Sequence, residues 1–275
     1  MNWSAARRVI FGTPLPTEEA AHQRLPKILA LPVFASDALS SSAYATQEIL
    51  LNLALAGTVA LHVTLPITIA IVMLLAVVTI SYIQTVHAYP SGGGAYIVAS
   101  ENLSRQMGLL AAAALLTDYI LTVAVSVASG VQQVTSLLPE LTQFTVPLCI
   151  LVILFVTLAN LRGVKESGVL FAFPTYFFLI SVLGMIVWGV VSRHILGIPP
   201  YRLPQPPIQA TTALSVALVL KAFASGCSAL TGVEAISNGV QAFRPPESKN
   251  AAQTLTAMAV LLGSLVLGIS YLAQA

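Results

Sequence analysis

Seven long apolar stretches fill most of this 275-residue chain and leave few folds open to it. They cover approximately residues 28–56, 64–88, 107–138, 146–161, 168–191, 213–242 and 251–273. A helix needs about 20 mainly apolar residues to cross the hydrocarbon core of a bilayer. Only 8% of the residues are charged, against about 25% in a soluble domain, which is too few to cover a water-facing surface. We therefore predict an all-α, polytopic membrane protein.

The basic residues between the stretches predict its orientation, because Lys and Arg accumulate in cytoplasmic loops. With the N-terminus inside, only Arg193 and Arg202 fall outside. The cytoplasmic side then holds Arg7, Arg8, Arg24, Lys27, Arg105, Arg162, Lys165, Arg244 and Lys249. We predict a cytoplasmic segment at residues 1–26 and a membrane domain at 27–275, in the cell membrane. The two cysteines, Cys149 and Cys227, lie in apolar stretches without the spacing of a disulfide framework or a metal site.

An acidic residue, Asp37, interrupts the first stretch among small and polar residues, and a related interruption follows at 223–234. A charge at the centre of a membrane helix costs about 2.5–3.5 kcal/mol on insertion scales. Irregular backbone at that depth is tolerated only where it is buried in protein or lines a cavity. We therefore predict that the first and sixth helices are discontinuous and border a substrate site. The sequence Phe-Ala-Ser opens both interruptions, at 34–36 and 223–225, which hints at an internal repeat.

A second polar group lies within the third stretch, where Thr122 and Ser126 come four and eight residues after Asp118. This spacing places the three side chains on one face of a helix. A carboxylate and two hydroxyls form an all-oxygen lining, which hard cations prefer. The alternative is that both hydroxyls bond back to main-chain carbonyls of their own helix.

Three further residues extend these groups. Tyr44 lies about two helical turns after Asp37, and Thr231 lies inside the second interruption. Glu234 follows it, and burial favours the neutral form of a carboxylic acid, so Glu234 is a candidate for binding and releasing a proton. Its alternative is a structural hydrogen bond. Two other charged residues within the stretches, Glu48 and Lys221, are read as interfacial or structural.

Several motifs resemble the amino acid–polyamine–organocation (APC) superfamily of transporters. The broad ones are Tyr-Pro-Ser-Gly-Gly-Gly-Ala-Tyr at 89–96, a tight turn whose glycines allow close backbone packing, and Asn-Leu-Arg-Gly-Val-Lys-Glu-Ser at 160–167. The segments at 36–41, 118–126 and 228–235 are similar to the KimA-type potassium importers of the KUP-like group. The resemblance implies a LeuT-like fold of two inverted five-helix repeats, here truncated to about seven helices with an incomplete second repeat. It also implies alternating access around a midplane site.

Carried over by position, the resemblance assigns roles to seven residues. The potassium path would be lined by Asp37, Tyr44, Asp118, Thr122, Ser126 and Thr231, with Asp118, Thr122 and Thr231 holding the ion. Glu234 and Asp37 would couple transport to protons. The expected partners are the bilayer, potassium and protons, with no cofactor and no nucleic acid, and a homodimer is left open. The cyclic di-AMP domain of this branch is missing, so we expect no nucleotide binding.

The leading hypothesis is therefore a secondary active transporter that takes up potassium with protons. The alternative is an amino acid or polyamine permease of the same superfamily. An acid at position 37 would repel the carboxylate of an amino acid, whereas cationic polyamines are harder to exclude. No nucleophile–base pair, His-Glu-x-x-His motif or metal-ligand cluster appears among the four histidines, so we do not expect an enzyme.

Overall fold

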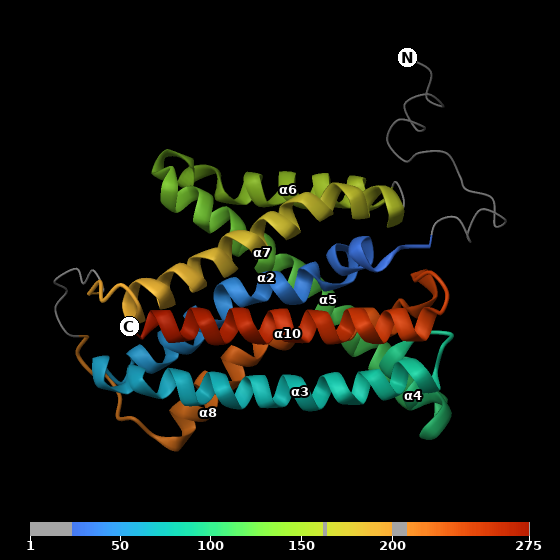
Figure 1. The fold of residues 1–275 in the computed structure, drawn as a ribbon, viewed down its shortest axis with the longest axis horizontal. Coiled ribbons are helices and arrows are strands. Elements are labelled where there is room, and N and C mark those ends of the chain that lie inside the picture. Colours follow the sequence, from blue (N-terminus) through green and yellow to red (C-terminus); the bar gives the residue numbers. More distant parts are fainter. Residues whose placement is uncertain (1–23, 162–163, 200–207, 275) are drawn as a thin grey trace, which may run out of the picture. The chain divides into compact units, whose positions relative to one another are not determined.

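The computed structural model describes residues 24–161, 164–199 and 208–274, and the regular structure within them is helical apart from one isolated β-bridge (Figure 1). The predicted cytoplasmic segment lies, up to residue 23, outside the described residues. The long helices are α2 (Lys27–Ala54), α3 (Thr64–Ala88), α5 (Arg105–Leu137), α6 (Thr145–Leu161), α7 (Val164–His194) and α10 (Glu247–Ala273). The shorter elements are η2 (Thr58–Val63), α4 (Gly94–Asn102), η3 (Pro139–Phe144), α8 (Val216–Gly226), η4 (Cys227–Leu230), α9 (Ala235–Asn238) and η5 (Val240–Ala242).

Seven helical segments of the described residues are long and apolar enough to cross a membrane, in agreement with the seven stretches of the sequence. The prediction of an all-helical, multi-pass membrane protein is thus confirmed. The agreement extends to the bounds: α3 begins and ends at the predicted residues 64 and 88. The sequence did not predict α4, a nine-residue helix that follows the glycine-rich turn.

The predicted break in the first helix is not found, because α2 is one continuous helix through Asp37. We correct that prediction, and the serines around Asp37 supply the reason. The hydroxyls of Ser40 and Ser41 donate to the Asp37 carbonyl at 2.8 and 3.1 Å, and Ser42 donates to the Leu39 carbonyl at 2.6 Å. Serines that bond back to the preceding turn are accommodated within a helix. The polar run therefore needs no unwound backbone.

The sixth candidate span, Val216–Asn238, contains irregular backbone. Its helix α8 ends at Gly226, and the 3₁₀ turn η4 follows. Thr231 is then extended, with φ −63° and ψ 143°, and Gly232 has a φ of 79°. Helical structure resumes only at Ala235 in the short helix α9.

The chain forms two compact units, and each is described by itself. The first unit consists of the described parts of Met1–Ala35, Thr85–Pro174 and Glu234–Thr254. The second consists of the described parts of Ser36–Gln84, Thr175–Val233 and Leu255–Ala275.

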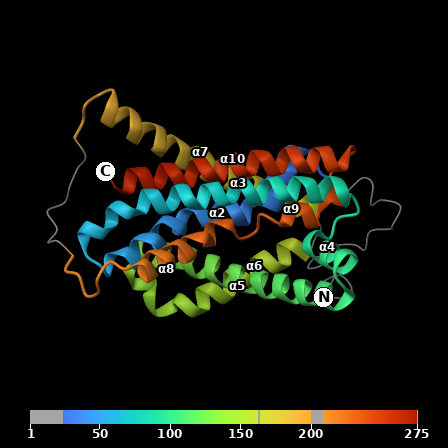
Figure 2. The same ribbon diagram turned by 90° about the horizontal axis from the view of Figure 1, so that it is seen from below.

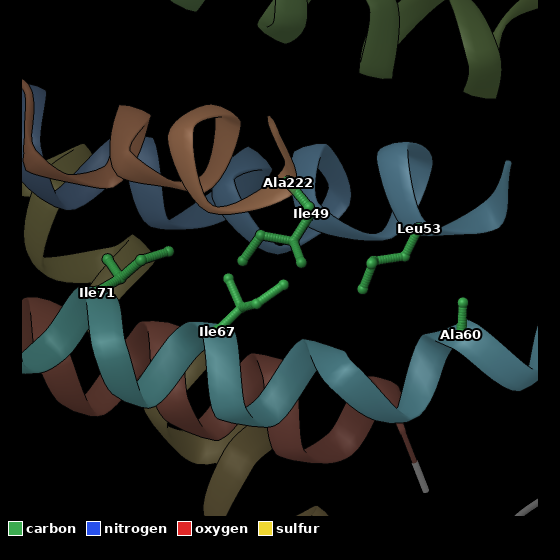
Figure 3. Close-up of a cluster of buried hydrophobic side chains, with 6 residues drawn as sticks. All are labelled: Ile49, Leu53, Ala60, Ile67, Ile71 and Ala222. Atoms are coloured by element: carbon green, nitrogen blue, oxygen red, sulfur yellow. The ribbon is translucent and has the colours of Figure 1, made fainter. Parts of the chain in front are cut away.

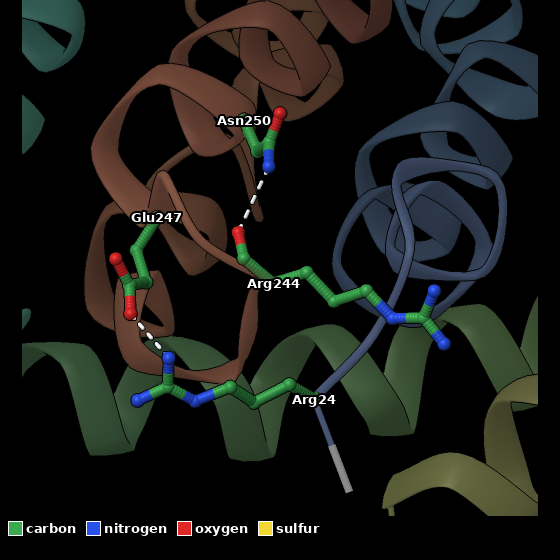
Figure 4. Close-up of polar contacts among 4 residues, drawn as sticks. All are labelled: Arg24, Arg244, Glu247 and Asn250. Atoms are coloured by element: carbon green, nitrogen blue, oxygen red, sulfur yellow. Dashed lines mark hydrogen bonds and ion pairs between the residues drawn. The ribbon is translucent and has the colours of Figure 1, made fainter. Parts of the chain in front are cut away.

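In the first unit, the chain entering α2 pairs with the turn that leads into α10 (Figure 4). The amide of Arg244 donates to the Leu25 carbonyl at 3.1 Å, and Arg24 forms an ion pair with Glu247. The side-chain amide of Asn250 donates to the Arg244 carbonyl at 2.8 Å. These contacts hold together two segments that are far apart in the sequence.

In the second unit, a cluster of six buried apolar side chains joins four elements (Figure 3). The cluster comprises Ile49 and Leu53 of α2, Ala60 of η2, Ile67 and Ile71 of α3, and Ala222 of α8. Gly226 lets α8 end against it, since a Cβ atom there would lie 2.6 Å from both Ile49 and Ile71. Lipid is as apolar as these side chains, so close packing is what such a cluster contributes. Helices α3 and α10 also run side by side in both views (Figures 1 and 2).

Candidate functional site

In the second unit, Asp37 of α2 lies against the irregular backbone of the sixth span. A Cβ atom on Gly232 would be 2.7 Å from Oδ2 of Asp37 and 3.0 Å from its Cβ and Cγ atoms. Glycine is the one residue that permits both this approach and the φ of 79° without cost. The sequence therefore places a half-buried carboxyl group beside main chain that is not part of a helix.

Ser41 connects the other two predicted residues of this unit. It is completely buried, and its hydroxyl oxygen lies 2.8 Å from the Tyr44 hydroxyl and 3.2 Å from Oγ1 of Thr231. The Thr231 hydroxyl also donates to the Ser228 carbonyl at 2.9 Å. Because Ser41 also donates to the main-chain carbonyl of Asp37 at 3.1 Å, Asp37, Tyr44 and Thr231 belong to one oxygen-rich cluster, which we call the α2–231 cluster (Asp37, Ser41, Tyr44, Thr231). The sequence reasoning missed Ser41, whose only signal was its position one turn after Asp37.

Three predicted residues, Asp118, Thr122 and Ser126, lie at successive turns of α5 in the first unit. Thr122 is buried, with 7% of its surface exposed. The hydroxyl oxygen of Ser126 is also buried, and it has no hydrogen-bond partner among the described residues. The alternative in which Ser126 bonds back to its own helix is therefore not what the structure contains. We call these three residues the α5 stripe.

Glu234, the proton-coupling candidate, immediately precedes α9 in the first unit and is 7% exposed. Its main-chain carbonyl accepts hydrogen bonds from the Ser237 hydroxyl at 2.8 Å and from the Asn238 amide at 3.0 Å. One carboxylate oxygen, Oε1, is buried.

The glycine-rich turn of the first unit packs against α9, as its three glycines suggested. The amide of Gly93 donates to the Asn238 carbonyl at 3.3 Å, and a Cβ atom on Gly92 would lie 2.7 Å from that carbonyl oxygen. The side-chain amide of Asn238 donates to the Tyr119 hydroxyl of α5 at 2.7 Å. The sequence reasoning missed Asn238 and Tyr119 because their partners are distant in the chain.

A groove of about 410 Å³ lies between α3 and α10 in the second unit, and none of the predicted site residues lines it. Its lining is apolar except for a few hydroxyls, among them Thr79 and Ser264, and it carries no charged side chain. It therefore lacks the carboxylates that a cation site would use. Among the described residues, no group of three or more His, Cys, Asp or Glu side chains is arranged to hold a metal ion.

Comparisons with known proteins agree with this architecture. Residues 31–275 match the family described as amino acid permease. The chain is also 43% identical, over 276 aligned residues, to the protein named potassium transporter KimA of Bacillus subtilis (strain 168). That alignment covers 98% of the chain but 45% of the relative, so the chain spans less than half of the length of this curated protein.

Proposed function

Since this chain belongs to the amino acid permease family, we propose that it carries the cation site of a secondary active transporter that imports potassium together with protons. The relative named as a potassium transporter supports potassium as the cargo. The proposal includes a LeuT-like inverted-repeat fold, alternating access and a cytoplasmic N-terminus in the cell membrane.

The α2–231 cluster is the observation that carries the proposal. It combines three hydroxyl groups with a carboxylate that lies next to the irregular backbone at Gly232. The Ser41 oxygen lies 2.8 Å from the Tyr44 oxygen and 3.2 Å from the Thr231 oxygen. Hard cations take carboxylate, hydroxyl and carbonyl oxygens as ligands. Irregular backbone at membrane depth supplies such oxygens in transporters.

The α5 stripe supports the proposal from the first unit. Its Ser126 hydroxyl is buried and leaves an oxygen for a ligand to contact. We propose that Asp118, Thr122 and Thr231 hold potassium and that the other stripe and cluster residues line its path. That both groups line one path remains a prediction of the sequence resemblance.

For proton coupling, we propose Glu234 and Asp37. Glu234 is nearly fully buried, and Asp37 is half-buried with its carboxyl group beside Gly232. Like charges repel, so a cation and a proton compete for a carboxyl group. Cation binding and proton release are thereby linked at these two groups.

A second candidate is an amino acid or polyamine permease, which the description of the family favours. The carboxyl group of Asp37 argues against a substrate whose α-carboxylate must sit beside the same backbone. A polyamine lacks that carboxylate and is the stronger of the two alternatives.

Rubidium uptake by the complete protein, in cells that lack their own potassium importers, tests the cargo. Wild-type cells should accumulate rubidium, and Asp118→Ala combined with Thr231→Ala should lower the rate more than about tenfold, equivalent to about 1.4 kcal/mol. Thr117→Ala is the matched control, because within the described part of the chain this exposed α5 hydroxyl bonds only the Ala113 carbonyl of its own helix, at 2.9 Å. Undiminished uptake by the well-expressed double variant would refute the site. Uptake of labelled spermidine or amino acid without rubidium would favour the alternative.

Proton coupling has a separate test. In proteoliposomes, an inward potassium gradient should acidify the lumen, and Glu234→Gln should abolish the acidification. Glu101→Gln, a change at an exposed carboxylate of α4, should leave it intact. Potassium entry without acidification in the wild-type protein would refute symport but not potassium transport.

A further inference from the structure

We propose that Ser41 is a positioning residue that sets which monovalent cation the α2–231 cluster accepts, by holding the Tyr44 and Thr231 hydroxyl oxygens at fixed spacing. The proposal rests on the proposed function and deepens it. The Ser41 side chain contacts both α2, at the Asp37 carbonyl and the Tyr44 hydroxyl, and the irregular segment, at the Thr231 hydroxyl.

The hydroxyl of Ser41 has more partners than its proton can serve. It lies 3.1 Å from the Asp37 carbonyl, 2.8 Å from the Tyr44 hydroxyl and 3.2 Å from the Thr231 hydroxyl. With the contact from Thr231 to the Ser228 carbonyl, there are four contacts for the three protons of three hydroxyl groups. One of the four contacts therefore lacks a proton at any time.

The main-chain carbonyl oxygens of Asp37 and Ser228 cannot donate a proton, which limits which of the four contacts can lack one. If Thr231 donates to the Ser228 carbonyl and Ser41 donates to the Asp37 carbonyl, Tyr44 donates its proton to the Ser41 oxygen. No proton then lies between Ser41 and Thr231, and lone pairs of both oxygens face each other across 3.2 Å. A cation that touches both oxygens removes this repulsion.

A second direction of the Ser41 hydroxyl proton is favoured when no cation is bound. The Asp37 carbonyl also accepts from Ser40 at 2.8 Å, so the Ser41 proton can leave it and turn toward Thr231. The Ser41 hydroxyl therefore has two positions, one that fills the contact with Thr231 and one that frees both oxygens for a cation. The spacing of those oxygens, which Ser41 fixes, decides the size of cation that both can touch.

Cation competition in the complete protein tests the proposal. Rubidium uptake is measured against potassium, caesium and sodium for the wild type and for Ser41→Ala. We expect Ser41→Ala to raise the KM for rubidium about tenfold, with Vmax within about twofold, and to reduce the preference for potassium over sodium by a similar factor. A merely structural role would lower Vmax for all cations and leave their relative KM values unchanged.

The matched control is Ser42→Ala. Ser42 is the next residue and is also completely buried, and among the described residues its hydroxyl donates only to the Leu39 carbonyl in its own helix. Ser42→Ala should keep the wild-type KM values and cation preference. Ser41→Cys is a second variant, for use if Ser41→Ala does not fold. It fills the same space with sulfur, a poor ligand for hard cations, and should show the same rise in KM and the same loss of preference that we expect for Ser41→Ala.

A binding readout makes the outcome independent of turnover. Potassium should raise the melting temperature of the purified wild-type and Ser42→Ala proteins, and should raise that of Ser41→Cys less at the same concentration. Wild-type KM, preference and potassium-induced stabilisation in Ser41→Cys would overturn the role of Ser41 while leaving potassium transport standing. Absence of rubidium uptake and of potassium stabilisation in the wild type would instead overturn the proposed function, and this inference with it.

Discussion

The α-carbon of Gly232 lies so close to the carboxyl group of Asp37 that a Cβ atom on the glycine would be 2.7 Å from Oδ2. The two residues come from α2 and from the irregular part of the sixth span, and their contact adjoins that of Ser41 with Thr231. Gly232 therefore fixes how closely the irregular segment approaches the one carboxyl group of the α2–231 cluster.

We predict that Gly232→Ala lowers rubidium uptake by the complete protein more than about tenfold. An L-residue at a φ of 79° costs about 1–2 kcal/mol. The added methyl group also displaces the Asp37 carboxyl group, and the tenfold loss corresponds to about 1.4 kcal/mol. Initial uptake rates, normalised to the amount of protein in the membrane, provide the measurement.

Gly197→Ala separates the two effects. Gly197 has a φ of 62°, but a Cβ atom there would meet no described atom within 4 Å. This variant carries the backbone strain without the clash, and its uptake should stay within about threefold of the wild type. Equal losses in the two variants would show that strain alone explains the result and that contact with Asp37 does not matter.

The sequence could predict the spans but not the course of their backbone at Asp37. The length of the apolar stretches alone predicted the ends of α3 and α5 to within two residues, because the thickness of a bilayer sets that length. The break expected in α2 was wrong because the sequence does not reveal whether a serine bonds to its own helix or to another. The structure answers this for Ser40 and Ser42, which bond within α2.

The candidate site could be predicted in part for a related reason. Charged residues such as Asp37 stand out in an apolar stretch, since each one is costly there. Ser41 is one of several serines in a row, and only its contact with Thr231, 190 positions away, distinguishes it. Asn238 became recognisable in the same way, through the glycine-rich turn that packs on it.

Three buried hydroxyls connect α2, α3 and α10 in the second unit and predict a stability effect. Ser270 lies 2.9 Å from the hydroxyls of both Thr46 and Thr68, and Thr68 also donates to the Thr64 carbonyl at 2.9 Å. We predict that Ser270→Ala destabilises the protein by about 1–2 kcal/mol, because hydroxyl contacts between membrane helices contribute about 0.6 kcal/mol each and a buried partner is left unsatisfied. Thermal unfolding in detergent measures it.

Ser264→Ala on the same helix is the control for this change. Ser264 is exposed, and the one partner of its hydroxyl among the residues that the structure describes is the Val260 carbonyl at 2.7 Å, so the melting temperature should not fall. If Ser264→Ala and Ser270→Ala unfold at the same temperature, the hydroxyl cluster does not contribute to stability.

The glycine-rich turn predicts a packing defect in the first unit. Gly94 has a φ of 45°, and a Cβ atom there would overlap Oδ1 of Asn238 and approach Oγ of Ser237 within 2.9 Å. We predict that Gly94→Ala lowers the yield of monodisperse protein in size-exclusion chromatography, because α9 must shift. Gly130→Ala in α5 should not, since its Cβ atom would meet no described atom within 4 Å. Normal yield of Gly94→Ala would contradict the proposed packing.

For Ser126→Ala we predict that protein stability is kept or increased while cation transport is weakened. Its buried hydroxyl has no hydrogen-bond partner among the described residues, so Ser126→Ala removes a desolvated polar group without breaking a bond. The melting temperature without potassium should therefore stay the same or rise, while the KM for rubidium increases severalfold if Ser126 contacts the cation. Ser136→Ala, an exposed α5 site whose hydroxyl bonds the Gln133 carbonyl at 2.8 Å, should change neither quantity. A lower melting temperature with an unchanged KM would make Ser126 a structural residue and remove it from the potassium path.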